Sequence, residues 1–98
     1  MSVYLGDMVM LPCLINGEPK PNVQWFKDEK EVDLQNLNFL LHPGDGILEI
    51  RSLQFPNYGR YKCKRTNGER SKYSATALLI QNTDVGRFTL LFSPHYVL

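Results

Sequence analysis

The stretch Asn57-Tyr58-Gly59-Arg60-Tyr61-Lys62-Cys63 is the part of this sequence that decides the fold. Its first residues have the composition of a turn, and the rest alternates aromatic or sulfur side chains with cationic ones. Successive side chains of a β-strand point to opposite faces of the sheet. The pattern therefore predicts a turn followed by a strand that directs Tyr61 and Cys63 toward a core and its cationic residues toward solvent.

Two residues far upstream belong to the same pattern. Cys13 lies 50 positions before Cys63, and Trp25, the single tryptophan, lies between them. Period-two patterns run through residues 8–13 and again through 23–26, and each would place one of these two residues on its inward face. We therefore expect two further strands, each with one buried face.

Turn signals divide the rest of the chain into more short strands. Residues 42–46 are dense in turn residues and precede an apolar alternation at 48–50. Asn67-Gly68 is a two-residue hairpin signal, and the strand after it is expected at 73–80. Short edge elements fit between residues 31 and 41. Strands of this length, joined by turns and without a helical pattern, predict an all-β domain.

The order of the cysteines, the tryptophan and the tyrosine two positions before the second cysteine resembles the immunoglobulin superfamily, intermediate set, over residues 2–82. The resemblance implies an all-β fold, a two-sheet antiparallel immunoglobulin-like β-sandwich with Greek-key topology. It also implies a disulfide between Cys13 and Cys63. Trp25 would pack against that bridge, and Tyr61 would return its hydroxyl to the chain at a corner.

The sequence departs from the family pattern at Asn57, where the family usually carries Asp. The side-chain oxygen of Asn can still cap the turn, but it cannot form the ion pair that Asp often makes there. We therefore expect a slightly weaker corner and an unchanged fold.

Size and charge restrict the function classes. The chain has 98 residues, enough for one domain, and its net charge of +1 gives no general attraction to nucleic acid or to an anionic membrane. Its apolar runs are too short to span a bilayer. The histidines and the acidic residues clustered at 28–33 lack metal-ligand spacing. We therefore expect no enzyme activity, no catalytic residue, no metal, no cofactor, no nucleic-acid binding and no direct membrane insertion.

The resemblance implies a non-catalytic protein-interaction or spacer module of a multidomain cell-surface receptor or adhesion protein. Such a module lies on the extracellular side of the plasma membrane, where disulfides persist. The alternative is a structural immunoglobulin domain of a cytosolic muscle or cytoskeletal filament protein, a scaffold or mechanical spacer whose cysteines stay reduced. The lack of an Asn-x-Ser/Thr sequon favours that alternative. Few residues precede the strand at 8–13, so we expect the chain to be part of a longer protein.

Six of the eleven cationic residues fall between positions 60 and 72. By strand alternation, Arg60, Lys62 and Lys64 share the solvent face of their strand, and Phe26 in the neighbouring strand lies on the same sheet face. An exposed aromatic ring beside cations suits recognition of an acidic protein surface or of a heparan-sulfate-like glycan, although cations on a sheet face also serve solubility alone. The candidate partner-binding residues are Phe26, Arg60, Lys62, Lys64, Arg65, Arg70 and Lys72.

Residues 83–98 do not fit the family pattern, whose last strand ends near Ile80, and they form a tail of unknown role. The run Phe88-Thr89-Leu90-Leu91-Phe92 has high β-propensity and no charge, so we expect it to pair or pack somewhere. The tail fits the start of another domain, a spliced end or an added sequence, whereas Tyr96-Val97-Leu98 would suit capture by a PDZ domain. Exposed strand edges also suggest a homodimer.

Overall fold

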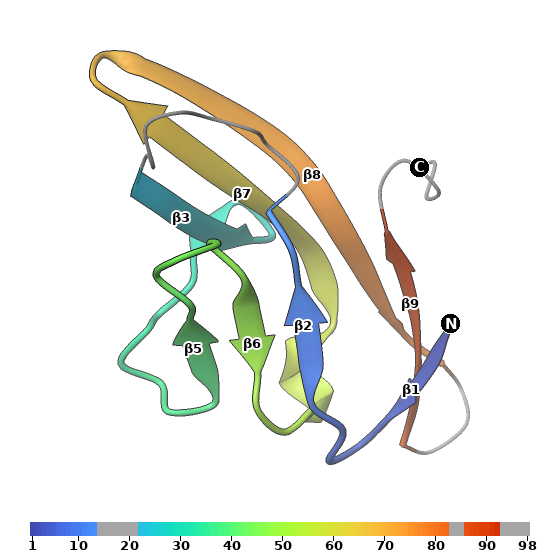
Figure 1. Ribbon diagram of the computed structural model, residues 1–98. Coiled ribbons are helices and arrows are strands. Elements are labelled where there is room, and N and C mark those ends of the chain that lie inside the picture. The colour runs from blue at the N-terminus through green and yellow to red at the C-terminus, as the bar shows by residue number, and fades with distance from the viewer. Residues whose placement is uncertain (14–21, 83–85, 93–98) are drawn as a thin grey trace.

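Two antiparallel sheets pack against each other in the computed structural model, which describes residues 1–13, 22–82 and 86–92 (Figure 1). The larger sheet has the strand order β1–β9–β8–β7–β3–β4, and the smaller sheet has the order β2–β6–β5. The described part of the chain contains no helix that is long and apolar enough to cross a membrane. The elements are β1 (Ser2–Tyr4), β2 (Val9–Leu11), β3 (Asn22–Lys27), β4 (Lys30–Glu31), β5 (Phe39–Leu41), β6 (Leu48–Ile50), the 3-10 helix η1 (Phe55–Asn57), β7 (Gly59–Asn67), β8 (Arg70–Gln81) and β9 (Arg87–Phe92).

Inward side chains of both sheets form one core. On β2, Val9 and Leu11 are buried while Met10 between them is exposed, and Leu48 and Ile50 are the buried positions of β6. This alternation turns one face of each short strand toward the other sheet, as the period of a strand requires. The β-sandwich predicted from the sequence is therefore confirmed. Its most buried apolar side chains are those of Leu11, Leu48, Ile50, Leu53, Tyr61, Cys63, Ala77, Leu79 and Phe88.

A disulfide between Cys13 and Cys63 links the two sheets, with their Cα atoms 5.7 Å apart. Trp25 lies opposite Cys63 in the β3–β7 ladder and is buried. Its indole Nε1 donates a hydrogen bond to the carbonyl oxygen of Gly46 at 2.8 Å, which satisfies the polar end of a large apolar ring. Trp25 thereby connects the larger sheet to the turn that precedes β6.

The turn before β7 is held by Asn57, which is buried. Its side-chain Oδ1 accepts a hydrogen bond from the backbone N–H of Gln54 at 2.8 Å and a longer one, at 3.3 Å, from the Nδ2 of Asn38. The Tyr61 hydroxyl donates to the backbone carbonyl of Asn57 at 2.6 Å. Asn57 therefore caps the turn through its side-chain oxygen and anchors the tyrosine through its main chain.

The corner predicts a specific sensitivity to alkaline pH. Burial, together with a smaller effect of the Asp28 carboxylate, raises the pKa of Tyr61 well above its usual value near 10. The unfolded chain then releases this proton at a pH at which the folded chain retains it, so the stability is fully present below about pH 10 and falls as the pH rises further. We expect Tyr61→Phe to cost about 1 kcal/mol at neutral pH and to weaken this alkaline loss, measured as the urea midpoint against pH.

The exposed Tyr58→Phe is the matched control, and its urea midpoint should follow that of the unmodified chain. If Tyr61→Phe and Tyr58→Phe lose stability with equal slopes above pH 10, the alkaline loss does not come from Tyr61.

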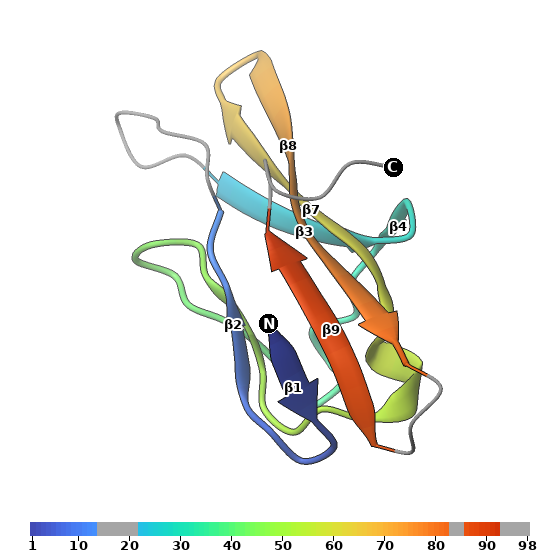
Figure 2. The same ribbon diagram turned by 90° about the vertical axis from the view of Figure 1, so that its right-hand side faces the viewer.

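β9 places the apolar run of the tail inside the larger sheet, between β1 and β8 (Figure 2). It pairs antiparallel with β8 from Gln81↔Phe88 to Ala77↔Phe92, and β1 pairs antiparallel with its other edge. The expectation that this run pairs or packs is therefore confirmed. The proposed carboxyl-terminal motif Tyr96-Val97-Leu98 lies outside the described residues.

The hairpin between β7 and β8 differs from the sequence prediction by one residue. The connecting residues are Gly68 and Glu69, and Asn67 instead pairs with Arg70. Gly68 has a φ of +63°, a conformation that glycine adopts without steric cost. Glycine therefore takes the first turn position, and β8 begins at Arg70 rather than near Tyr73.

Candidate functional site

The outer face of the larger sheet aligns side chains from β3, β7 and β8. In the β3–β7 ladder Gln24 lies opposite Lys64 and Phe26 lies opposite Lys62, and in the β7–β8 ladder Lys64 lies opposite Tyr73. Directly opposed residues in neighbouring strands point to the same face. The three strands thus bring two aromatic rings and two lysines onto one surface that faces away from the smaller sheet.

These four side chains, Phe26, Lys62, Lys64 and Tyr73, form what we call the aromatic–lysine cluster. The two rings are 6.0 Å apart between centroids and tilted by 51°. The Lys62 Nζ lies 5.0 Å from the Tyr73 centroid and 6.0 Å from that of Phe26, and the Lys64 Nζ lies 5.4 Å from that of Tyr73. Both ammonium groups lie within the range of attraction to a ring face. The rings therefore hold the two charges at defined positions on the outer face of the sheet.

Acidic side chains border the cluster on the β4 side. Glu29, in the turn between β3 and β4, forms an ion pair with Lys62 at 2.5 Å, and its side chain is 80% exposed. Glu31 on β4 accepts a hydrogen bond from the Gln24 side chain at 2.6 Å. Ion pairs this exposed to solvent contribute little stability and exchange readily. An acidic group of a partner can therefore replace Glu29 at Lys62.

Arg60 lies on the same sheet face but outside the cluster. It borders a shallow groove of about 480 Å³, whose other lining residues include Tyr58, Leu78 and Ile80. The backbone N–H of Arg60 donates to the Asp28 carboxylate at 3.0 Å. Arg60 therefore extends the cationic surface toward an apolar part of the face.

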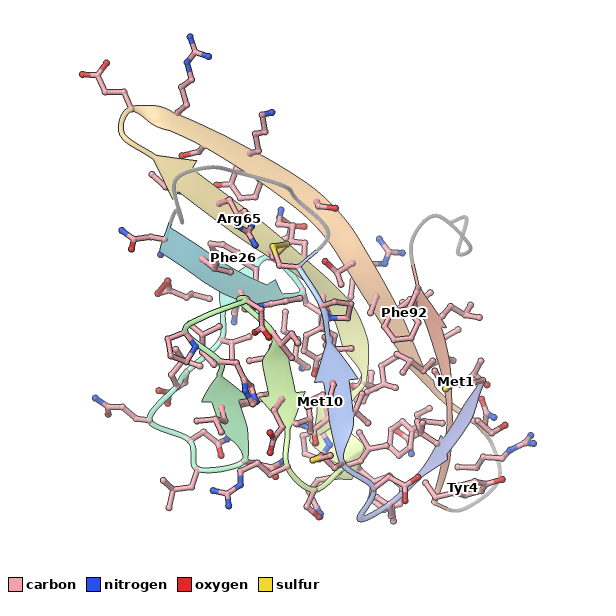
Figure 3. All side chains as sticks on the ribbon, viewed as in Figure 1. Met1, Tyr4, Met10, Phe26, Arg65 and Phe92 are labelled. Carbon is pink, nitrogen blue, oxygen red and sulfur yellow. A yellow bond between two sulfur atoms is a disulfide. The ribbon has the colours of Figure 1, made fainter. Side chains whose placement is uncertain are left out.

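Three other candidates project from the opposite face of the sheet. Arg65 lies opposite Val23 on one side and Lys72 on the other, and it alternates with Lys64 along β7. Arg70 and Lys72 are exposed near the hairpin tip. The pairing of β7 with β8 places them on the same face of the sheet as Arg65. Figure 3 labels both Arg65 on β7 and Phe26 on β3, whose side chains belong to opposite faces of the sheet. Adjacent residues of a strand thus point to opposite faces of the sheet. The structure does not bring these three cations to the aromatic–lysine cluster.

Tyr73 is the member of the cluster that sequence reasoning missed. It is 56% exposed, and it contacts both lysines and the ring of Phe26. The register of a hairpin follows from its two turn residues, so a turn at Gly68-Glu69 places Tyr73 opposite Lys64. The signal was therefore the hairpin itself, because its pairing of β8 with β7 puts Tyr73 on the face of Lys62 and Lys64.

The described residues also bear on metal binding. Over residues 1–13, 22–82 and 86–92, no three His, Cys, Asp or Glu side chains gather closely enough to hold a metal ion. The aromatic–lysine cluster itself offers charge and aromatic contact.

Known proteins match this chain over most of its length. The model of the immunoglobulin domain family matches residues 1–67. Human vascular endothelial growth factor receptor 1 is 33% identical over 82 residues, which cover 84% of this chain and 6% of the receptor. Tyrosine-protein phosphatase Lar of Drosophila melanogaster is 31% identical over 80 residues, 81% of this chain and 4% of that protein. In the solved structure of the extracellular domains 3–5 of Drosophila OTK, the match has a TM-score of 0.63 and 32% identity, and it covers 74% of this chain and 25% of that one.

The chain spans less than a tenth of the length of these curated relatives. The phosphatase activity in the name of Lar belongs to that whole protein, of which the match covers only a small part. What the alignments have in common is one domain of the type described above.

Proposed function

This chain belongs to the immunoglobulin domain family, and from that premise we propose that it is a non-catalytic recognition or spacer module of a larger receptor. Its relatives include a receptor and a protein whose matched domains are named extracellular. The disulfide between Cys13 and Cys63 suits the oxidising side of the plasma membrane. These observations favour a cell-surface protein over a module of a cytosolic filament.

The aromatic–lysine cluster is the observation that supports recognition. Interfaces are rich in aromatic residues, and an aromatic ring beside a cation offers both apolar contact and charge. Phe26 and Tyr73 provide ring surface, and Lys62 and Lys64 provide two cations whose positions the rings define. The partner that fits this surface is a protein whose contact region is acidic, with Glu29 as the group that it displaces from Lys62.

A charge-reversal experiment tests this proposal. We expect Lys62→Glu/Lys64→Glu to reduce the retention of the domain on an immobilised oligo-glutamate peptide by about tenfold at low salt, because both cations are lost and two anions appear. Retention of the unmodified domain should fall as ionic strength rises. Retention by surface plasmon resonance across a salt series is the measurement.

Lys30→Glu is the matched control, since Lys30 is an exposed cation on β4 that the cluster does not include. Equal loss in Lys30→Glu and in the single variant Lys62→Glu, which change the net charge by the same amount, would mean that only net charge matters, and the proposed face would then have no special role. A heparin surface run in parallel identifies the other partner class: retention on heparin but not on oligo-glutamate would assign the face to a sulfated glycan. A homodimer is the third class of partner that the sequence suggests. It would form through the strand edges of the sheet and would not use the aromatic–lysine cluster.

A further inference from the structure

β9 fills a strand-shaped site at the edge of β8. Five residues of β8, Ala77 to Gln81, pair with Phe92 to Phe88 in antiparallel register. On the outer side of β9, β1 pairs with Arg87, Phe88 and Thr89, and the backbone N–H of Leu90 donates to the carbonyl of Met1 at 2.8 Å. β9 is thus bonded along both edges. Without it, β8 would present a free edge to solvent.

The side chains of β9 make the site specific. Phe88 is fully buried and Leu90 is 3% exposed, and both belong to the hydrophobic core. Phe92, at the end of the strand, packs against the same core (Figure 3). The ring of Phe88 lies 6.2 Å from that of Phe55 in η1. The site therefore accepts an extended segment with large apolar side chains at every second position, and the core is incomplete when the site is empty.

One connection joins β9 to the remainder of the domain. Five residues, 82–86, separate the end of β8 from the start of β9. When β9 leaves its site, its apolar side chains and the vacated core both become exposed to water, which is unfavourable for both. A second copy of the chain carries the strand that matches the vacated site in length, register and side chains. The contacts of β9 with a foreign β8 are then the same as those with its own.

We propose that the site between β1 and β8 is a strand-acceptor site whose partner is a second copy of this chain, so that two chains exchange β9 and form a symmetric dimer. Exchange of an identical element is a low-cost route to a dimer, because it needs no new interface. Within one chain, β9 has an effective concentration on the order of millimolar, as a short connection implies. The dimer therefore forms when the chain refolds at high concentration. The acceptor site at β8 and β1 is a different surface from the aromatic–lysine cluster, and exchange of β9 does not depend on recognition of a partner there.

Cysteines placed across the β8–β9 ladder detect the exchange. Ile80 and Thr89 lie directly opposite each other, and both are on the outer side, away from the core. Opposed Cα atoms in an antiparallel pair lie within the range that a disulfide spans. A chain with Ile80→Cys and a chain with Thr89→Cys are mixed, unfolded together at acidic pH without reductant, refolded over a range of concentrations and mildly oxidised. The acidic pH slows exchange with the Cys13–Cys63 bridge.

We expect a disulfide-linked heterodimer in the intact mass, with a yield that rises with the chain concentration during refolding. The control mixture pairs Ile80→Cys with Leu37→Cys, whose position is 82% exposed and outside the ladder, and it gives the collisional background. A severalfold excess over this background supports exchange. Equal yields from the two mixtures at every concentration would overturn the proposal.

A second measurement does not depend on the single variants. The double variant Ile80→Cys/Thr89→Cys, oxidised as a monomer, locks β9 to its own β8. Light scattering after refolding should show a dimer for the unmodified chain and a monomer for the locked chain. A dimer in both, or in neither, would exclude exchange of β9.

Discussion

We expect reduction of the Cys13–Cys63 disulfide to lower the free energy of unfolding by about 4 kcal/mol, because it frees a loop of 50 residues in the unfolded chain. A small domain has about 5–15 kcal/mol of stability in total, so this loss is a large share of it. The single tryptophan, Trp25, is buried and lies beside the bridge in the β3–β7 ladder. Urea unfolding followed by its fluorescence, with and without reductant, measures the change directly.

The double variant Cys13→Ala/Cys63→Ala separates the bridge from other effects of the reductant. It should unfold at a urea concentration near that of the reduced chain, and reductant should not shift it further. If the unmodified domain unfolds at the same midpoint in both redox conditions, the bridge contributes nothing to stability. The chain would then behave as expected for a module of a cytosolic filament, and the proposal of a cell-surface receptor would lose its physical support.

The parts of the fold that the sequence predicts are those determined over a few residues. β2, β6 and β7 follow from a period of two, since each alternate side chain must be buried or exposed. The corner at Asn57 and Tyr61 likewise lies within five consecutive residues. Local pattern and local hydrogen bonds suffice for both.

The composition of the aromatic–lysine cluster depends on how the strands are aligned, and a local sequence pattern determines this register less firmly. A turn displaced by one residue changes which residue of β8 lies opposite Lys64. Alternation within β3 and β7 predicts Phe26, Lys62 and Lys64 on one face, but it does not extend across the hairpin to β8, so it omits Tyr73. It also groups Arg65 with Lys64, although adjacent residues of a strand face opposite sides.

The place of β9 could not be derived from its composition. An apolar run with high β-propensity predicts that it pairs, but a free strand edge accepts any such run, and the sequence does not rank the edges. In the structure this run pairs with the edge of β8, where Phe88 also completes the core beside Phe55. The choice thus depends on contacts between residues distant in sequence.

The larger sheet consequently has two separate surfaces, each with its own proposed role. Its outer face at β3, β7 and β8 holds the aromatic–lysine cluster, and its β1–β9–β8 edge holds a strand that the core requires. A change in the cluster alters exposed side chains, so it should affect binding and leave stability nearly unchanged. A change in β9 should do the reverse.

We expect Phe88→Ala to destabilise the domain by about 3–5 kcal/mol, as is usual when a buried phenylalanine is removed from a core. Phe88 is fully buried, contacts the ring of Phe55 and pairs with both Val3 and Gln81 across its two ladders. Its removal deletes apolar contacts and leaves a cavity between the strand and η1. Urea unfolding at neutral pH with the disulfide intact gives the free energy.

Leu91→Ala is the matched control, because it shortens an apolar side chain of the same strand on the outer, half-buried side. We expect it to cost about 1 kcal/mol or less, since little of that side chain is removed from water. A large difference between the two variants establishes that β9 completes the core, and that the folded unit extends to Phe92. If Phe88→Ala costs no more than Leu91→Ala, β9 is only an appended strand, the folded unit ends near residue 82, and the acceptor site loses the apolar contacts that make it specific.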